Sequence, residues 1–232
     1  RSTLLASSAA SDVYKRQIYL CFTFSLTTLC YKKFGKVGLF VWMMLSVVIC
    51  NIQTIKLSEI GGFVTSLGNI SYGAVFLTSD ILSEKYGEKE CFKAIKFSFL
   101  GMIVFTISML LFLSYTPSKL DTSQEALSIV FSYMPRVTLA SLTSYLISQV
   151  VDAKLYTWFK RKFKKVWISN NASTFISQMI DTFLFTCISF VGVLSGIELL
   201  ELMMTMLIFK WVIAFLDTPF MILVTKLKAN EV

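Results

Sequence analysis

The sequence predicts an all-α fold, a polytopic transmembrane helical bundle of six or seven spans. Of its 232 residues, 55% are hydrophobic, with 21 Phe and a mean hydropathy of +0.69. The apolar residues fall in long blocks rather than in amphipathic stripes, and about 20 such residues cross a bilayer as a helix. With no Pro-, Gly- or Ser-rich linker between the blocks, we expect one transmembrane domain over 18–232.

The first 17 residues differ from the rest of the chain. They are polar and rich in Ser and Ala, and residues 12–17 read Asp-Val-Tyr-Lys-Arg-Gln, which resembles translated read-through of a sequencing-library adapter. We therefore expect residues 1–17 to be an artefact rather than native sequence. A secretory signal is the competing interpretation, but its order of basic, apolar and cleavage regions is missing from this sequence.

Apolar segments follow one another along the chain. The first is short for a span, and if it does not cross the membrane six spans remain. The third contains four glycines, at positions 61, 62, 68 and 73, which would let helices approach closely. The predicted spans are 18–31, 37–55, 60–82, 97–115, 136–159, 167–191 and 199–225.

Two local signals add detail to these spans. Thr122 followed by Glu125 reads as a capping box that opens a short surface helix toward Tyr133. Pro219 is expected to kink the end of the last span.

The charge of the connections predicts the topology. Alternate connections are basic, and we expect them to be cytoplasmic. Seven spans then place the carboxyl terminus inside. The net charge of +8 follows from these connections, so we expect contact with membrane lipid and no nucleic-acid partner. The basic residues are Lys32, Lys33 and Lys36; Lys85, Lys89, Lys93 and Lys96; Lys160, Arg161, Lys162, Lys164 and Lys165; and Lys226 and Lys228.

Several kinds of chemistry are excluded. The sequence has no His, which removes Ser-His dyads and HExxH zinc sites, and it has no P-loop motif for ATP hydrolysis. The five cysteines lack metal-type spacing, and we interpret most of them as packing residues. No cofactor or metal is expected.

One polar phrase occurs twice inside apolar sequence. It reads Ile-Ser-Gln-Val-Val-Asp at 147–152 and Ile-Ser-Gln-Met-Ile-Asp at 176–181. In a helix, Gln and Asp three residues apart project from one face. A carboxylate in hydrocarbon costs several kcal/mol unless it faces a partner or a polar cavity. The two helices are therefore expected to face each other or a shared cavity.

Depth along the helices predicts two polar layers. At about 1.5 Å per residue, Asp181 and Lys210 both lie roughly 10 Å below the outer surface, and we expect them to form an ion pair. Asp217 falls near the cytoplasmic third of the membrane, level with Asp152 and with the Asn pair at 170–171. The polar residues would then form an outer and an inner layer around one cavity.

Motifs along most of the chain together resemble the queuosine precursor transporter family, also described as vitamin-uptake-transporter-like. The resemblance runs from about Gly35 to Lys226. The motifs are Thr78-Ser79-Asp80 with Tyr86-Gly87, Pro135-Arg136 through Ala140-Ser141, Gln149 to Asp152, Asn170-Asn171-Ala172-Ser173-Thr174 through Gln178 to Asp181, and Lys210 with Asp217 to Pro219.

This resemblance implies a multi-pass protein of the bacterial inner membrane that imports 7-deazaguanine precursors such as 7-cyano-7-deazaguanine, and not an enzyme. The donors of a deazaguanine suit a carboxylate acceptor, and its carbonyl suits an amide donor. Phe175, Phe183, Tyr145 and Trp211 could stack on the flat ring. The expected substrate-binding residues are Asp80, Arg136, Gln149, Asp152, Asn170, Asn171, Gln178, Asp181, Lys210 and Asp217.

Alternatives remain open at this point. Gln149 and Gln178 could simply join helices by hydrogen bonds, and Asp80 and Glu84 could lie at a solvated helix end. The chain could be the substrate-binding subunit of an ATPase-energised uptake system, with Lys160 to Lys165 docking the partner, or it could form a homo-oligomer. A membrane-embedded aspartate enzyme is the alternative from another class.

Overall fold

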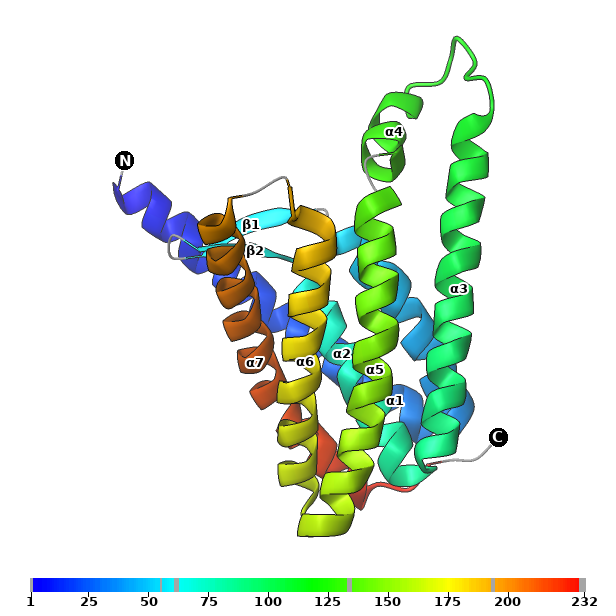
Figure 1. Ribbon diagram of the computed structural model, residues 1–232, viewed down its shortest axis with the longest axis vertical. Helices are drawn as coiled ribbons and strands as arrows, with labels where there is room; N and C mark the ends of the chain where they lie inside the picture. Colours follow the sequence, from blue (N-terminus) through cyan, green and yellow to red (C-terminus); the bar gives the residue numbers. More distant parts are fainter. Residues whose placement is uncertain (1, 55, 61–62, 133–134, 193–194, 230–232) are drawn as a thin grey trace.

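The computed structural model describes residues 2–54, 56–60, 63–132, 135–192 and 195–229, and its helices form one bundle (Figure 1). The all-α fold class is confirmed, with one small hairpin of strands among the described residues. The elements are α1 Ser2–Thr54, β1 Leu57–Ile60, β2 Phe63–Ser66, α2 Gly68–Lys85, α3 Glu88–Ser114, α4 Gln124–Ser132, α5 Pro135–Phe163, α6 Val166–Phe190 and α7 Gly196–Lys226.

Helix α1 consists of two antiparallel halves. The chain reverses at Gly35, whose φ of 55° suits a residue without a side chain. Contacts on either side of this turn join the halves. The Trp42 Nε1 donates to Thr27 Oγ1 at 2.7 Å, and the Gln53 Nε2 donates to the Tyr19 hydroxyl at 2.8 Å. The predicted segments 18–31 and 37–55 therefore form a helical hairpin, and the number of spans stays a prediction. That residues 1–17 are foreign stays a prediction.

The predicted start of the third span is wrong. Residues 57–60 and 63–66 pair as antiparallel strands with Ile60 opposite Phe63, and α2 begins only at Gly68. A Gly-Gly pair between apolar residues is a hairpin signal, and the apolar content of 60–82 concealed it. Gly61 and Gly62 themselves lie outside the described residues.

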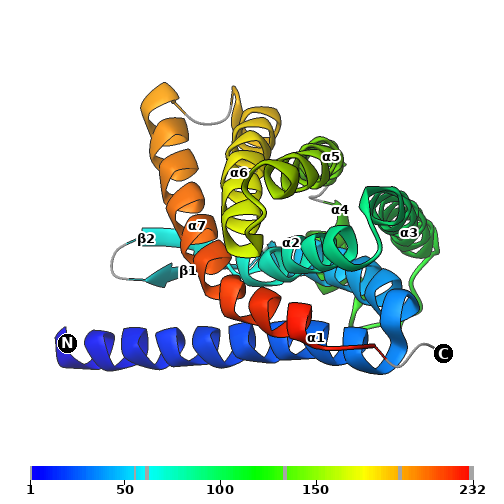
Figure 2. The same cartoon turned by 90° about the horizontal axis from the view of Figure 1, so that it is seen from below.

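Helix α2 is the centre of the bundle. It contacts α1, α3, α5 and α7, which surround it when the molecule is seen from below (Figure 2). A side chain at Gly68 would collide with Thr54 of α1, and one at Gly73 would collide with Ile213 of α7. These two glycines therefore allow the close helix approach that the sequence predicted.

Two further boundaries differ from the prediction. Helix α3 begins at Glu88, so the residues expected to form a charged loop before 97 are helical. The short surface helix α4 was correctly expected, but its first N–H groups are capped differently. Asp121 Oδ1 accepts from the backbone nitrogens of Ser123, at 2.8 Å, and Gln124, at 3.2 Å, whereas the prediction assigned the cap to Thr122.

The four basic connections gather at one end of the bundle. Lys36 in the α1 turn pairs with Glu90 of α3 at 3.1 Å, and Lys160 of α5 pairs with Glu84 of α2 at 2.8 Å. Lys85 donates to carbonyls at the end of α7 at 3.0 and 3.1 Å. The β-hairpin and the α3–α4 and α6–α7 connections lie at the opposite end (Figure 1). The predicted alternation of basic and other connections is thus present in the fold.

The helices have the dimensions of membrane spans. By length and composition, three stretches of the described chain are apolar enough to cross a bilayer: 11–54, 88–114 and 196–226. Helices α5 and α6 contain 29 and 25 residues, so at about 1.5 Å per residue they are also long enough. Their polar residues lower the mean hydropathy, but most of these residues are buried inside the bundle.

Candidate functional site

The repeated phrases meet across the interface between α5 and α6. Ser148 of the first copy donates to Asp181 of the second at 3.3 Å, and Ser177 of the second copy donates to Asp152 of the first at 2.7 Å. Because the helices are antiparallel neighbours (Figure 1), this exchange relates the two copies by a local two-fold axis. The expectation that the phrases face each other is confirmed.

The outer layer is built around Asp181. Lys210 of α7 donates to its Oδ2 at 2.5 Å, and only 5% of either side chain is exposed. The Tyr72 hydroxyl of α2 donates to its Oδ1 at 2.7 Å. The Lys210 ammonium also lies 4.9 Å from the centre of the Tyr72 ring, a cation–π distance. The predicted ion pair is present, and its charges are satisfied within the protein.

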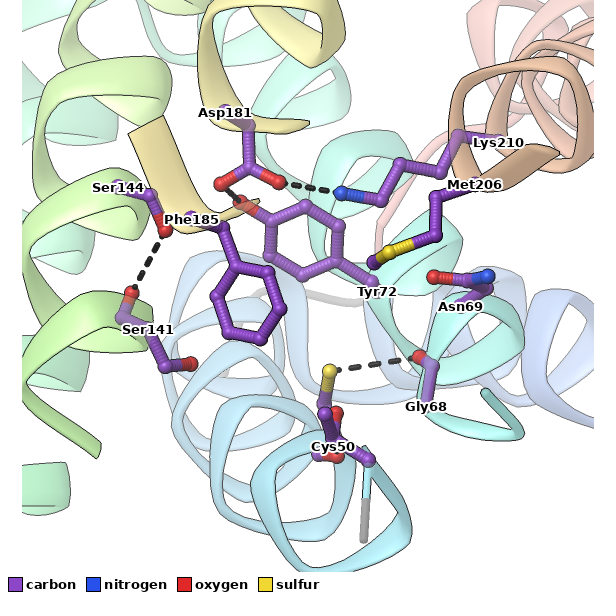
Figure 3. A pocket seen from close by; sticks show the side chains of 11 residues that line it. Cys50, Gly68, Asn69, Tyr72, Ser141, Ser144, Asp181, Phe185, Met206 and Lys210 are labelled. Atoms are coloured by element: carbon purple, nitrogen blue, oxygen red, sulfur yellow. Dashed lines mark hydrogen bonds and ion pairs between the residues drawn. The ribbon is translucent and has the colours of Figure 1, made fainter. Parts of the chain in front are cut away.

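A small cavity adjoins this pair. Its volume is about 30 Å³, enough for about two water molecules and too small for a two-ring base. Figure 3 shows Asp181, Tyr72 and Lys210 together on one side, with Phe185 and Met206 beside them. A larger ligand could enter only if these side chains moved.

The inner layer is built around Asp152. Its carboxylate accepts from Ser177 of α6 at 2.7 Å and from Ser79 of α2 at 3.3 Å. The carboxyl group of Asp80 lies within hydrogen-bonding distance of Asp152 and accepts from Thr174 at 3.4 Å. Both aspartates are fully buried, so the alternative of a solvated helix end is wrong for Asp80.

A third carboxyl group extends this layer to α7. Asp217, also fully buried, accepts from the Asn170 amide at 2.7 Å. Asn171 donates to the Thr218 hydroxyl at 2.8 Å. The prediction that Asp217 lies beside the Asn pair is confirmed.

Several buried amide atoms have no hydrogen-bond partner in the described part of the chain. They are both polar atoms of the Gln149 side chain and the side-chain oxygens of Gln178, Asn170 and Asn171. Unpaired buried polar groups cost about 1–3 kcal/mol each, so native proteins rarely leave them without a function. The alternative role of Gln149 was to join helices by a hydrogen bond, and its side chain makes no such bond in the described part of the chain.

Some expected site residues lie elsewhere. The exposed Arg136 donates to the carbonyls of Ile188 and Val191 at 2.8 and 2.6 Å and ties α5 to the end of α6. Of the aromatic candidates, Phe183 is 55% exposed, and Trp211 donates to the Phe175 carbonyl at 3.2 Å. Apart from Arg136, every predicted polar site residue is buried inside the bundle.

Tyr72 and Ser79 of α2 were not among the predicted site residues, although Asp80 of the same helix was. Tyr72 supplies the outer layer, and Ser79, seven residues or two turns later, supplies the inner layer. Their shared helical face with Asp80 was a signal available in the sequence. That face does not reveal which group each side chain meets, because Tyr72 contacts Asp181 of α6 and Ser79 contacts Asp152 of α5 only once the helices pack together.

The fold and the site together define a membrane transporter: a helical bundle with a buried polar core reached by several helices. The chain belongs to the family described as "Putative vitamin uptake transporter", whose model matches residues 66–224. It is therefore a transporter rather than an enzyme, which removes the aspartate-enzyme alternative.

The chain is also similar to a curated relative named "Probable queuosine precursor transporter" from Bacillus subtilis (strain 168). The two are 35% identical over 211 residues, which cover 90% of this chain and 92% of the relative. The resemblance inferred from the motifs is confirmed. No solved structure matches the chain.

Proposed function

We propose that this chain imports a 7-deazaguanine precursor of queuosine, such as 7-cyano-7-deazaguanine, across the bacterial inner membrane. The similarity to a queuosine precursor transporter supports this substrate class. The observation that carries the assignment of the site is the set of buried amide atoms of Gln149, Gln178, Asn170 and Asn171 that have no partner in the described part of the chain. A flat base rich in donors and acceptors would satisfy these atoms.

The chemistry of recognition follows from the groups available. A deazaguanine presents adjacent N–H and amino donors, which suit one carboxylate, and a ring carbonyl, which suits an amide donor. We assign Asp181 as the carboxylate and the Gln149 amide as the donor to the carbonyl. The side-chain oxygen of Gln178, one turn from Asp181 on α6, can accept a remaining ring donor. Asp152, Asp217, Asp80 and Asn170 then form the inner wall of the site.

Substrate entry requires the outer layer to open. The cavity beside Asp181 holds about 30 Å³, and the carboxylate is bonded to Lys210 and Tyr72. A base that replaced Lys210 as the partner of Asp181 would release the lysine. The ion pair would then act as a gate that parts when the substrate binds.

Rescue of queuosine synthesis tests this function. A strain that lacks precursor synthesis should regain queuosine in its tRNA at low external precursor when this chain is expressed. Asp181→Ala and Asp152→Ala should abolish the rescue even when it is scaled to the amount of each variant in the membrane, and Asp121→Ala in the exposed α3–α4 connection should not. Full rescue by both buried variants would remove these carboxylates from the site, and no rescue by the wild type would remove the substrate.

The orientation is tested separately. We propose that the basic end of the bundle faces the cytoplasm, because alternate connections carry the Lys and Arg residues. A reporter fused at Lys162 should behave as cytoplasmic, and one at Asp121 as external. A periplasmic signal at Lys162 would reverse the assignment. Co-purification of an ATPase with this basic end would favour the alternative of an ATPase-energised subunit.

A further inference from the structure

We infer that Asp80, Asp152 and Asp217 hold a proton that crosses the membrane together with the substrate. This inference rests on the proposed function and adds its source of energy. The three carboxyl groups come from α2, α5 and α7, and all are fully buried. Asp80 and Asp152 are within hydrogen-bonding distance of each other, and two adjacent carboxyl groups do not both ionise readily.

The cluster has no compensating cation among the described residues. Every hydrogen-bond donor to it that the structure shows is a neutral hydroxyl or amide. The nearby lysines have other partners: Lys210 binds Asp181 and Lys160 binds Glu84. Three ionised carboxylates buried in this way would each lose several kcal/mol of solvation without a partner.

The donors are also too few for the acceptors. Ser79 carries one hydroxyl hydrogen, and it lies 2.8 Å from the Phe76 carbonyl as well as 3.3 Å from Asp152. Ser177 likewise lies 2.9 Å from the Ser173 carbonyl. Each hydroxyl can fully serve only one acceptor. A proton added to the cluster supplies the missing donor.

A second, independent observation concerns Asn170. Its amide nitrogen donates to Asp217 Oδ1, but its own oxygen and Asp217 Oδ2 are buried and have no partner among the residues that the structure describes. Asn170 is fully buried and its amide reaches the cluster. Only a hydrogen-bond donor can satisfy these two oxygens. The Asn170–Asp217 pair is therefore a place where a proton can bind.

The other titratable groups around the cluster are accounted for. On α2, Glu84 lies one turn beyond Asp80. Lys85 of α2 donates to carbonyls at the end of α7. Cys91 of α3 donates to the Ser79 carbonyl at 3.4 Å. Tyr156 and Lys160 of α5 both donate to Glu84. The α6 residues that contact the cluster are neutral.

These groups also provide an exit. Tyr156 lies one turn beyond Asp152 on α5, and its hydroxyl donates to Glu84 at 3.0 Å. The Glu84 side chain is 18% exposed at the basic end. A proton taken up from the outer side by the carboxyl pair can leave through Glu84 to the water on the inner side, and the pair then ionises transiently until the next proton arrives.

Infrared spectroscopy tests the proton site without any substrate. Purified protein in lipid at neutral pH should show the carbonyl band of a buried, protonated carboxylic acid. The band should weaken in Asp80→Asn and Asp152→Asn and persist in Asp121→Asn. If the wild type shows no such band, the inference is wrong, and this result holds even where a variant fails to fold.

Proteoliposomes test whether the proton moves with the substrate. Without ATP, wild-type protein should accumulate 7-cyano-7-deazaguanine when the outside is more acidic. One pH unit should drive up to about tenfold accumulation if one proton enters per neutral substrate, and an internal pH dye should record its entry. Asp80→Asn should lose this accumulation, and Asp121→Asn should keep it.

The outcomes separate the two claims. A wild type that neither exchanges nor accumulates 7-cyano-7-deazaguanine would refute the proposed function, while the infrared result would still decide the proton site. A wild type that exchanges substrate but gains nothing from the pH gradient, with no proton entry, would overturn proton coupling alone.

Discussion

The two layers of the site differ in charge although they are built from copies of one phrase. The outer aspartate, Asp181, has a lysine and a tyrosine as partners. The inner aspartate, Asp152, has hydroxyl donors and two further carboxyl groups near it. The charge of each layer is therefore determined by the neighbouring helices α2 and α7 and not by the repeated phrase in α5 and α6.

Helix α7 shows this most directly. It contributes Lys210 to the outer layer and Asp217 to the inner layer, seven residues or about two turns apart on one face. Helix α2 contributes Tyr72 outside and Asp80 inside. Helices α5 and α6 are nearly symmetric, but α2 and α7 give the two layers different charges. The outer layer is neutralised and the inner layer is acidic. Such asymmetry suits a carrier that must treat its two sides differently.

The largest expected effect comes from breaking the outer ion pair. Lys210→Met or Asp181→Asn alone leaves an unmatched buried group and should destabilise the protein by about 3–5 kcal/mol. Transport should also be lost. The double variant should regain most of the stability without regaining transport, because it has no buried charge at this position and no gate. Thermal unfolding in detergent and membrane yield measure the stability.

The double-mutant cycle also supplies its own control. Residues that do not interact lose stability additively. If the two single losses simply add in the double variant, Asp181 and Lys210 are not coupled. The contrast between a paired outer layer and an unpaired inner layer would then be incorrect.

The sequence predicted the layers well and the element boundaries less well. Counting about 1.5 Å per residue placed Asp181 beside Lys210 and Asp217 beside Asn170, because straight helices in a slab of fixed thickness convert position into depth. The β-hairpin at 57–66 was missed because apolar content was taken as helix. Tyr72 was missed because its contact with Asp181 depends on how α2 packs against α6, which no local pattern encodes.

A smaller effect is expected at Tyr72. Tyr72→Phe removes the donor to Asp181 Oδ1 but leaves the ion pair, so the loss should be about 1.5–3 kcal/mol, the range for a bond to a charged group. Tyr115→Phe is the matched control, because Tyr115 is 75% exposed and should change stability by less than about 0.5 kcal/mol. Equal losses in chemical or thermal unfolding would show that Tyr72 does not hold the outer carboxylate.

The smallest effect concerns the two exchanged serines, and it compares the layers most directly. After Ser148→Ala, Asp181 keeps Lys210 and Tyr72, whereas after Ser177→Ala, Asp152 keeps only neutral hydroxyl donors among the described residues, Ser79 at 3.3 Å and Ser173. Ser177→Ala should therefore cost about 1 kcal/mol more than Ser148→Ala, the worth of one ordinary hydrogen bond. Ser114→Ala, at an exposed position on α3, corrects for the change of residue type. Unfolding measurements on the three variants in parallel test this difference. If Ser148→Ala costs more stability than Ser177→Ala, the outer carboxylate is the one short of donors. The assignment of the acidic, proton-holding layer to the inner end would then lose its structural basis.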